Sequence, residues 1–305
     1  MRREYRDRIQ RNDMNDRSRP QMPDRRKDPV KERLANVSGP TTNLQIKEGN
    51  EPKKFTGRCR LFVGNLPNTI TEEEFTAMFK PYGETAEVFL NISKGFGFVK
   101  LDTRQHAEAA KAALDFSLKD GKYLRVRFAT HGAALKVKNL NPWVSNELLE
   151  TAFSIFGDVE RAVVIVDDRG RPVGEGIVEY ARKQSAQQAL KRCTDGCFIL
   201  TSSLRPVLVE PLEQRDEEDG LPEKNFQKNM PEYQKEREMG PRLAEPGSFE
   251  FDYANRWKQL YKVEKQKRDN LDKEIMASRR RLDEQMEDSL YEHETNMLRE
   301  KLRAA

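Results

Sequence analysis

The sequence predicts an α+β protein in which two tandem βαββαβ units are followed by an extended segment and one long α-helix. From residue 58 onward, strand and helix patterns follow the order β-α-β-β-α-β. The same order then recurs, because the apolar run Leu61–Leu66 has a counterpart 74 positions later at Leu135–Leu140. From Phe249 on there is no Gly or Pro, and apolar residues repeat every 11 positions. These three observations predict the fold class.

The composition indicates that part of the chain lies outside any packed core. Apolar residues make up 36% of the 305 residues and charged residues 35%, whereas a compact domain has about 45–50% and about 25%. Three cysteines are an odd, sparse set that argues against a disulfide-stapled secreted fold. No apolar run approaches the ~18–20 residues of a membrane span, and the first residues do not form a secretory signal. We therefore expect an intracellular protein without a membrane partner.

Residues 1–57 are predicted to form a disordered basic arm. Residues 1–60 contain 17 Lys and Arg against 9 Asp and Glu, a net charge of +8, whereas the remainder of the chain has a net charge of −4. Few large apolar residues are present, and their burial would not offset the entropy cost of ordering the chain. Two interpretations remain open, namely an electrostatic arm for nucleic acid and a solvated tail.

The first unit is predicted over residues 58–130. A capping box opens its first helix, because Glu74 follows Thr71 by three positions. In chain order the expected elements are a strand at Leu61–Leu66, a helix carrying Phe75, Met78 and Phe79, strands at Glu84–Asn91 and Lys94–Leu101, a helix at Arg104–Phe116 and a strand at Tyr123–Phe128.

The second unit is predicted over residues 133–210, with elements in the same places. Phe153 and Gly157 correspond to Phe79 and Gly83, and the glycine pair of the third strand reappears as Gly174 and Gly176. The remaining elements are a helix at Ser145–Phe156, a strand at Val159–Val166 and a helix near Ser185–Lys191.

The third strand of the first unit resembles that of the RNA recognition motif (RRM). Lys94–Leu101 meets the signature K/R-G-F/Y-G/A-F-V-x-F/Y at seven of its eight positions. Alternate residues of a strand share a face, so Phe96 and Phe98 point to one side, and Phe62 lies between two better core residues. Bases stack on such rings at ~1–3 kcal/mol each. We expect Phe62, Phe96 and Phe98 to bind single-stranded RNA. Phosphate contacts are expected from Lys94, Arg125 and Arg127. Alternation along the last strand places Tyr123 on the same outward face as these two arginines.

The alternative is that these three phenylalanines belong to a core. One strand would then have to bury side chains on both of its faces, which the open sheet of this fold does not require. The stacking interpretation is therefore preferred.

The second unit lacks the rings. Lys136, Glu175 and Ile177 occupy the positions of Phe62, Phe96 and Phe98, and Glu175 and Glu179 would repel phosphate. We expect this unit to act mainly as a docking surface for protein, although Lys136, Lys138 and the loop at residues 169–171 remain candidates for backbone contacts with nucleic acid.

No residue pattern predicts catalysis or a metal site. Cys193 and Cys197 have no further Cys or His nearby, whereas structural zinc takes four ligands. Phosphate-binding loops and nucleophile motifs are absent from the sequence. We expect a protein that is not an enzyme and holds no cofactor.

Residues 211–248 are predicted to be an extended segment that docks on a partner or on the neighbouring domain. Four proline-containing steps interrupt regular structure, while Leu221, Phe226 and Tyr233 recur between them as anchors. A flexible linker is the alternative.

Residues 249–305 are predicted to form a coiled-coil helix. An 11-residue repeat corresponds to 3.67 residues per turn, which favours a right-handed supercoil. Such a narrow apolar stripe needs another helix to cover it. The stripe contains Leu260, Leu271, Leu282, Ile275 and Met286.

The order of these parts resembles the DBHS (Drosophila behaviour/human splicing) family of paraspeckle-type nuclear proteins. The stretches that carry the resemblance are Cys59–Leu66, Val144–Phe156, Asp167–Tyr180, Asp219–Lys224 and Phe249–Leu260. The resemblance implies an obligate homodimer or a heterodimer with a family member, with a right-handed antiparallel coiled coil. It also implies nuclear work in RNA retention, splicing, transcriptional regulation and DNA repair, with DNA as a further ligand, and it makes Tyr253 and Trp257 interface anchors.

Two hypotheses remain open at this point. In the first, the protein is a dimeric nuclear scaffold that binds RNA through the first unit. In the second, the first sheet is masked and the protein binds only other proteins.

Overall fold

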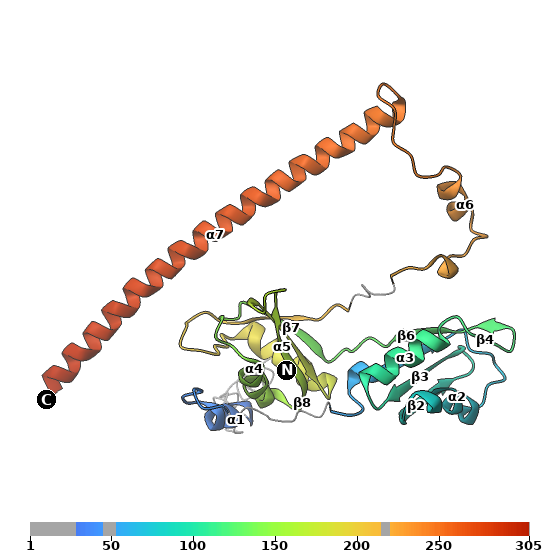
Figure 1. Ribbon diagram of the computed structural model, residues 1–305. Coiled ribbons are helices and arrows are strands. Elements are labelled where there is room, and N and C mark those ends of the chain that lie inside the picture. The colour runs from blue at the N-terminus through green and yellow to red at the C-terminus, as the bar shows by residue number, and fades with distance from the viewer. Residues whose placement is uncertain (1–28, 45–52, 215–219, 305) are drawn as a thin grey trace, which may run out of the picture. The chain divides into compact units, whose positions relative to one another are not determined.

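The computed structural model describes residues 29–44, 53–214 and 220–304, and it divides into two compact units after Asp216. The first unit contains two four-stranded sheets, and the second contains short helical turns and a long helix (Figure 1). This arrangement of elements confirms the predicted fold class of two RRMs followed by a long helix. Among the described helices, none combines the length and apolarity needed to cross a membrane.

The first RRM is a four-stranded antiparallel sheet in the order β2-β3-β1-β6 with two helices packed on one face. Every second side chain along each strand faces the helices and contributes to the core, which includes Leu61, Val63, Val99 and Val126. Its elements are η1 (Gly57–Cys59), β1 (Arg60–Gly64), α2 (Glu72–Phe79), η2 (Lys80–Tyr82), β2 (Thr85–Asn91), β3 (Phe96–Leu101), α3 (Arg104–Leu114), β4 (Leu118–Lys119), β5 (Lys122–Tyr123) and β6 (Arg125–Phe128).

The predicted capping box of α2 is confirmed. The Thr71 side chain accepts a hydrogen bond from the Glu74 amide, and the Glu74 carboxylate accepts one from the Thr71 amide. Both bonds satisfy backbone donors that the first helical turn leaves open.

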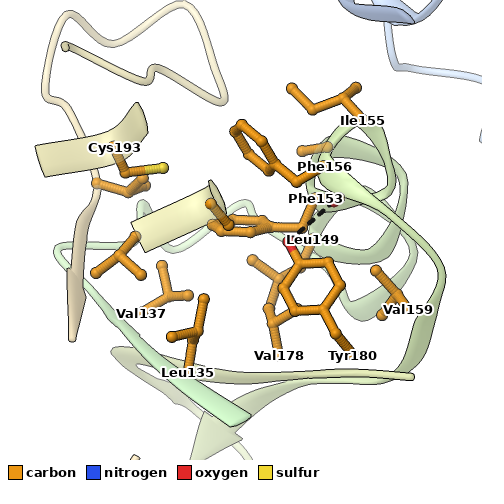
Figure 2. Close-up of a cluster of buried hydrophobic side chains, with 14 of the residues drawn as sticks. Leu135, Val137, Leu149, Phe153, Ile155, Phe156, Val159, Val178, Tyr180 and Cys193 are labelled. Carbon is orange, nitrogen blue, oxygen red and sulfur yellow. Dashed lines mark hydrogen bonds between the residues drawn. The ribbon is translucent and has the colours of Figure 1, made fainter. Parts of the chain in front are cut away.

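The second RRM repeats this sheet in the order β10-β7-β9-β8. In its core, the Tyr180 hydroxyl donates to the Phe153 carbonyl at 3.0 Å, and burial raises the pKa of Tyr180 (Figure 2). The bond satisfies a buried polar group, so the ring can fill the core without leaving its hydroxyl unpaired. The elements are β7 (Ala134–Lys138), α4 (Asn146–Phe153), η3 (Ser154–Phe156), β8 (Val159–Val166), β9 (Pro172–Tyr180), α5 (Lys183–Asp195) and β10 (Leu208–Pro211).

The prediction of disorder over residues 1–57 is wrong for its central part. Helix α1 (Pro29–Val37) packs against α4 and η3 of the second RRM, and Val30 belongs to the core of that domain. The Arg33 guanidinium also donates to the Ile155 carbonyl at 3.2 Å. Burial of the apolar side of α1 against the second RRM offsets the entropy cost of ordering this segment. The composition of the segment does not reveal that surface. Residues 1–28 and 45–52 of the arm lie outside the described residues.

The last predicted strand of the first RRM, Tyr123–Phe128, is divided in the structure. Lys122–Tyr123 pairs with Leu118–Lys119 in a separate two-stranded hairpin, and only Arg125–Phe128 joins the main sheet. The Tyr123 ring stacks on Phe116 at a centroid distance of 4.7 Å. Tyr123 therefore belongs to the hairpin and not to the main sheet that contains Arg125 and Arg127.

The second unit contains η4 (Glu223–Asn225), α6 (Pro231–Arg237) and α7 (Phe249–Ala304). The segment predicted to be extended is thus partly helical. Tyr233 donates a short hydrogen bond to the Glu223 carboxylate, which also accepts from Arg237 at 3.0 Å, and the Phe226 and Tyr233 rings lie 5.5 Å apart. These contacts hold η4 and α6 together. Helix α7 begins at the predicted residue and has no buried residue in the described chain.

Candidate nucleic-acid interface

One row of side chains crosses the open face of the first sheet from edge to edge. Strand register pairs Phe89 of β2 with Phe98 of β3, Phe98 with Phe62 of β1, and Phe62 with Arg127 of β6. Phe96 lies in the next row, opposite Gly64. The face therefore carries four phenyl rings and an arginine on adjacent strands.

The three predicted rings form one contiguous cluster. The Phe62 centroid lies 5.8 Å from that of Phe96 and 5.5 Å from that of Phe98, and Phe96 and Phe98 are 5.8 Å apart. All three side chains are partly exposed, whereas their strand neighbours Leu61 and Val99 are fully buried. Aromatic side chains that are partly exposed on a sheet face in this way can accept bases by stacking.

Gly64 makes room for this cluster. A Cβ atom at this position would lie 3.0 Å from Cε1 of Phe62, closer than side chains normally approach. The Phe62 ring therefore lies over the backbone of Gly64, in the space between Phe96 and Arg125.

The predicted cations differ in how far they are engaged. Lys94 and Arg125 are exposed. The Arg127 guanidinium forms an ion pair with Asp115 at 2.9 Å, so it is less available for phosphate than the other two. Arg60, which the sequence did not point to, lies over the Phe98 ring at 4.4 Å from its centroid.

The corresponding face of the second RRM is covered by charge pairs instead of rings. The equivalent row is Val163, Ile177, Lys136 and Glu210. Lys136 lies 2.7 Å from Glu175, and Lys138 lies 2.6 Å from Glu210. Each cation on this face is therefore neutralised by a carboxylate beside it, which reduces its attraction for phosphate.

Residues 61–125 and 135–199 match the RNA recognition motif family, and residues 206–258 match the NOPS (NUC059) domain. The solved structure of the C. elegans NONO-1 homodimer is 53% identical to this chain, with a TM-score of 0.71. That match covers 82% of this chain and 100% of the other. Paraspeckle component 1 of Rattus norvegicus is 57% identical over 261 residues, which is 85% of this chain and 50% of the relative. The splicing factor, proline- and glutamine-rich, of Mus musculus is 56% identical over 273 residues, or 90% and 39%. The chain belongs to the DBHS family.

The chain spans half or less of the length of these two curated relatives. The family resemblance predicted from short motifs is thus confirmed over most of the chain. NOPS covers the segment predicted to dock on a partner and the first residues of α7.

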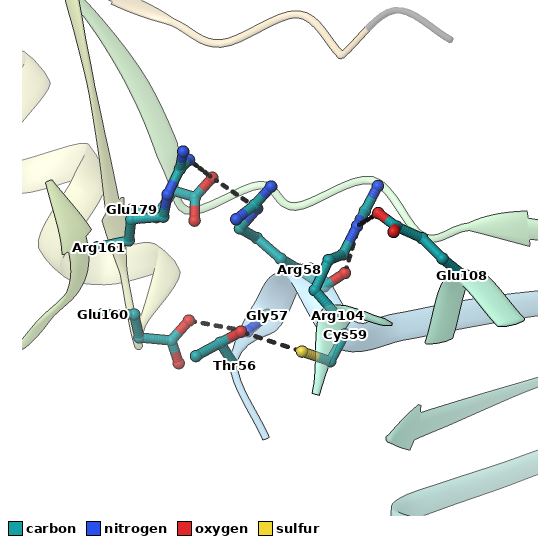
Figure 3. A network of polar contacts seen from close by, with 9 residues as sticks. All are labelled: Thr56, Gly57, Arg58, Cys59, Arg104, Glu108, Glu160, Arg161 and Glu179. Carbon is teal, nitrogen blue, oxygen red and sulfur yellow. Dashed lines mark hydrogen bonds and ion pairs between the residues drawn. The ribbon is translucent and has the colours of Figure 1, made fainter. Parts of the chain in front are cut away.

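In this DBHS protein, the segment leading into the first RRM is held against the second RRM (Figure 3). The Gly57 amide donates to the Glu160 carboxylate at 2.8 Å, and Lys53 donates to the Val159 carbonyl at 2.6 Å. Arg58 pairs with Glu179 at 3.5 Å, and Arg161 pairs with the same carboxylate at 3.4 Å. Glu179, which was expected to repel phosphate, is instead buried between two guanidinium groups.

His131 completes this contact. Its ring lies against Gly57, where no Cβ atom would fit, and its Nε2 is buried without a hydrogen-bond partner among the described residues. Burial lowers the pKa of His131 below its ordinary value of 6.5, with Glu179 and Glu160 acting against that shift and Lys100 and Arg58 adding to it.

The predicted dimer-interface residues of the second unit are largely uncovered in the single chain. Within the described residues, no intrachain core contains them. The exposed ones are Leu221, Phe226, Tyr253, Trp257, Leu260, Leu271, Ile275 and Leu282, while Tyr233 and Met286 are partly exposed.

Proposed function

We propose that this DBHS protein is a dimeric nuclear scaffold that binds single-stranded RNA on the first RRM. The second RRM, the NOPS segment and α7 supply the dimer contacts. The observation that carries the RNA-binding part is the cluster of Phe62, Phe96 and Phe98 on an uncovered sheet face. Aromatic rings on this sheet accept bases by stacking, and Lys94 and Arg125 are placed to meet phosphates.

Support for dimerisation comes from the second unit. Large apolar side chains repeat along α7, and none of its residues is buried within the chain. Tyr253 and Trp257 lie near the start of this helix, where the NOPS match also ends. A second copy of this chain or of a family member would cover them. The similar C. elegans NONO-1 structure is described as a homodimer.

Support for nuclear work comes from the relatives. They are named as a paraspeckle component and a splicing factor, not as enzymes, in agreement with the expectation that this chain is not an enzyme. Roles in RNA retention, splicing and transcriptional regulation are proposed for this chain on that ground, with DNA as an additional ligand.

The test is fluorescence anisotropy with a short single-stranded RNA at two salt concentrations. It compares the wild-type chain with a variant in which Phe62, Phe96 and Phe98 are replaced by Ala. Loss of stacking at ~1–3 kcal/mol per base should weaken binding roughly tenfold or more while the salt dependence is retained. Replacing the same residues by Leu keeps apolar packing and serves as the control for folding.

Unchanged RNA binding in both variants would contradict the stacking site. If, instead, the wild-type chain itself bound no RNA, the protein-only scaffold would be the better description. A monomer at micromolar concentration, measured by sedimentation, would contradict dimerisation.

A further inference from the structure

Phe89 faces the same side of the sheet as the predicted rings because β2 contains a bulge. Ala86 pairs with Lys100, and the next pair is Phe89 with Phe98. Two residues of β2 therefore lie opposite one residue of β3, which reverses the face of every later side chain. Glu87 absorbs the distortion with φ of +48°, a value that non-glycine residues rarely adopt.

The bulge exchanges Val88 and Phe89 between the two faces, and β8 of the second RRM has a register shift at the corresponding end, between Val159 and Arg161. Without it, Val88 would stand opposite Phe98, and Phe89 would enter the core. In the structure Val88 and Leu90 pack against the core, while Phe89 is 49% exposed. A large ring on the solvent side of a strand gains little for the fold, and β-bulges are known to redirect side chains at functional sites.

The exposed ring is continuous with the predicted cluster. Its centroid lies 6.3 Å from that of Phe96 and 6.3 Å from that of Phe98, with interplanar angles of 42° and 39°. The second RRM provides an internal comparison, because Val163 occupies the equivalent place beside Ile177 in the sheet that has no rings. A ring thus stands at this place in the RRM that has the other rings.

An ion pair lies at one end of this group of rings. Lys100 pairs with Glu87 at 2.8 Å across the bulge, beside the row that contains Phe89. On the other side, Asn91 pairs with Phe96 in register, and its side-chain oxygen accepts a hydrogen bond from the Lys94 amide at 3.1 Å. A strand of nucleic acid that leaves Phe96 and Phe98 toward β2 therefore meets Phe89 as its next apolar contact.

We propose that Phe89 is a fourth stacking residue, which extends the RNA site onto β2 by one further base. The inference rests on the proposed function, because it assumes that bases stack on Phe96 and Phe98. It assigns the role in binding to the ring and not to the bulge, because β8 of the second RRM also has a register shift but carries Val163 at the equivalent place. The ligand class is a single strand long enough to pass beyond the three predicted rings, which by themselves accept two or three bases.

The test measures binding of fluorescein-labelled oligouridylates of three and six nucleotides to the full chain by anisotropy. The variants are Phe89→Ala, Phe89→Leu and Phe89→Trp, and Leu118→Ala is the control because Leu118 is 62% exposed on the separate hairpin. We expect Phe89→Ala and Phe89→Leu to weaken binding of the six-nucleotide RNA roughly tenfold and that of the three-nucleotide RNA less than about twofold. Phe89→Trp should bind the longer RNA at least as tightly as the wild type.

Several results would overturn the inference. Unchanged binding of the longer RNA to Phe89→Ala, or an equal loss on both RNAs with Phe89→Leu, would show that the ring adds no separate base site. The Phe62, Phe96 and Phe98 variant separates this failure from that of the proposed function. If that variant binds weakly and Phe89→Ala binds normally, only the fourth base is disproved. If it binds as tightly as the wild type, the stacking site itself is disproved.

Discussion

The guanidinium of Arg58 lies 3.5 Å from the carboxylate of Glu179, although one residue precedes the first RRM sheet and the other lies in the sheet of the second. Glu179 is only 3% exposed, and Arg161 approaches the same carboxylate. The ion pair therefore links the lead-in segment of one domain to the buried centre of the next, so the two RRMs are coupled by a polar contact that a substitution can remove.

Glu179→Gln should weaken this coupling. The substitution keeps the shape of the side chain but leaves two guanidinium groups without their shared anion, and we expect a loss of about 1–3 kcal/mol in the free energy of unfolding. Hydrogen exchange at the Gly57 amide should also become faster. Glu175→Gln is the matched control, since it removes a more exposed ion pair with Lys136 on the same sheet and should cost under about 1 kcal/mol. Equal losses in the two variants would argue against a special role for Glu179.

His131 should make the stability of this contact depend on pH. Because burial lowers its pKa below 6.5, the unfolded chain takes up a proton first as the pH falls. The stabilising contribution is therefore complete above about pH 6.5 and is lost as the pH falls from there through the lower pKa of the folded protein. Glu179, Glu160, Lys100 and Arg58 are the charged groups around the ring.

The measurement is the free energy of unfolding between about pH 7.5 and 5 for the wild type and for His131→Asn. The variant should show a weaker decrease with falling pH. Parallel curves for the two proteins would mean that carboxylates elsewhere cause the entire acid effect.

Helix α1 should detach when Val30 is replaced by Asp. The Val30 side chain is 8% exposed in the core of the second RRM, and a carboxylate there would lose its hydration without a partner. We expect a loss of about 2 kcal/mol and cleavage of the arm at lower protease concentration. Ala35→Asp introduces the same charge on the exposed face of α1 and should behave like the wild type. If Ala35→Asp were equally susceptible, charge and not the packing of Val30 would explain the effect.

Trp257→Ala should weaken the proposed dimer. A large aromatic side chain at the root of α7 is a typical hot spot, and its truncation is expected to cost about 2 kcal/mol or more, corresponding to roughly 30-fold in the dimer dissociation constant. Leu271→Asp with Leu282→Asp should separate the distal part of the helices. Sedimentation over a concentration series measures both, with Lys258→Ala as the neighbouring control. A dissociation constant unaffected by Trp257→Ala would remove this residue from the interface.

The first RRM could be predicted in detail because its signals are local. The run Lys94–Leu101 contains both the glycines and the alternating rings, and the period of two then places Phe96 and Phe98 on one face. Phe62 follows from its position between Leu61 and Val63, which are fully buried as the pattern requires. These inferences needed no knowledge of contacts between distant residues.

Phe89 could not be found in this way. Alternation counted from Ala86 assigns Val88 to the open face, and no residue in the sequence marks the bulge at Glu87, where glycine would be the usual signal. Tertiary pairing with β3 decides the register. The same applies to α1, because a helix of nine residues is too short to form alone and depends on the surface that receives Val30.

Helix α7 has 56 residues and, among the described residues, not one that is buried. We therefore expect the helix to be stabilised by association with another molecule. Its helix content should then depend on protein concentration. Dilution should unwind the helix before either RRM unfolds, so that circular dichroism at decreasing concentration would fall while the sheets persist. At ~1.5 Å per residue, the fully ordered α7 is about 80 Å long. The length of this helix that is ordered would then indicate the concentration of the protein.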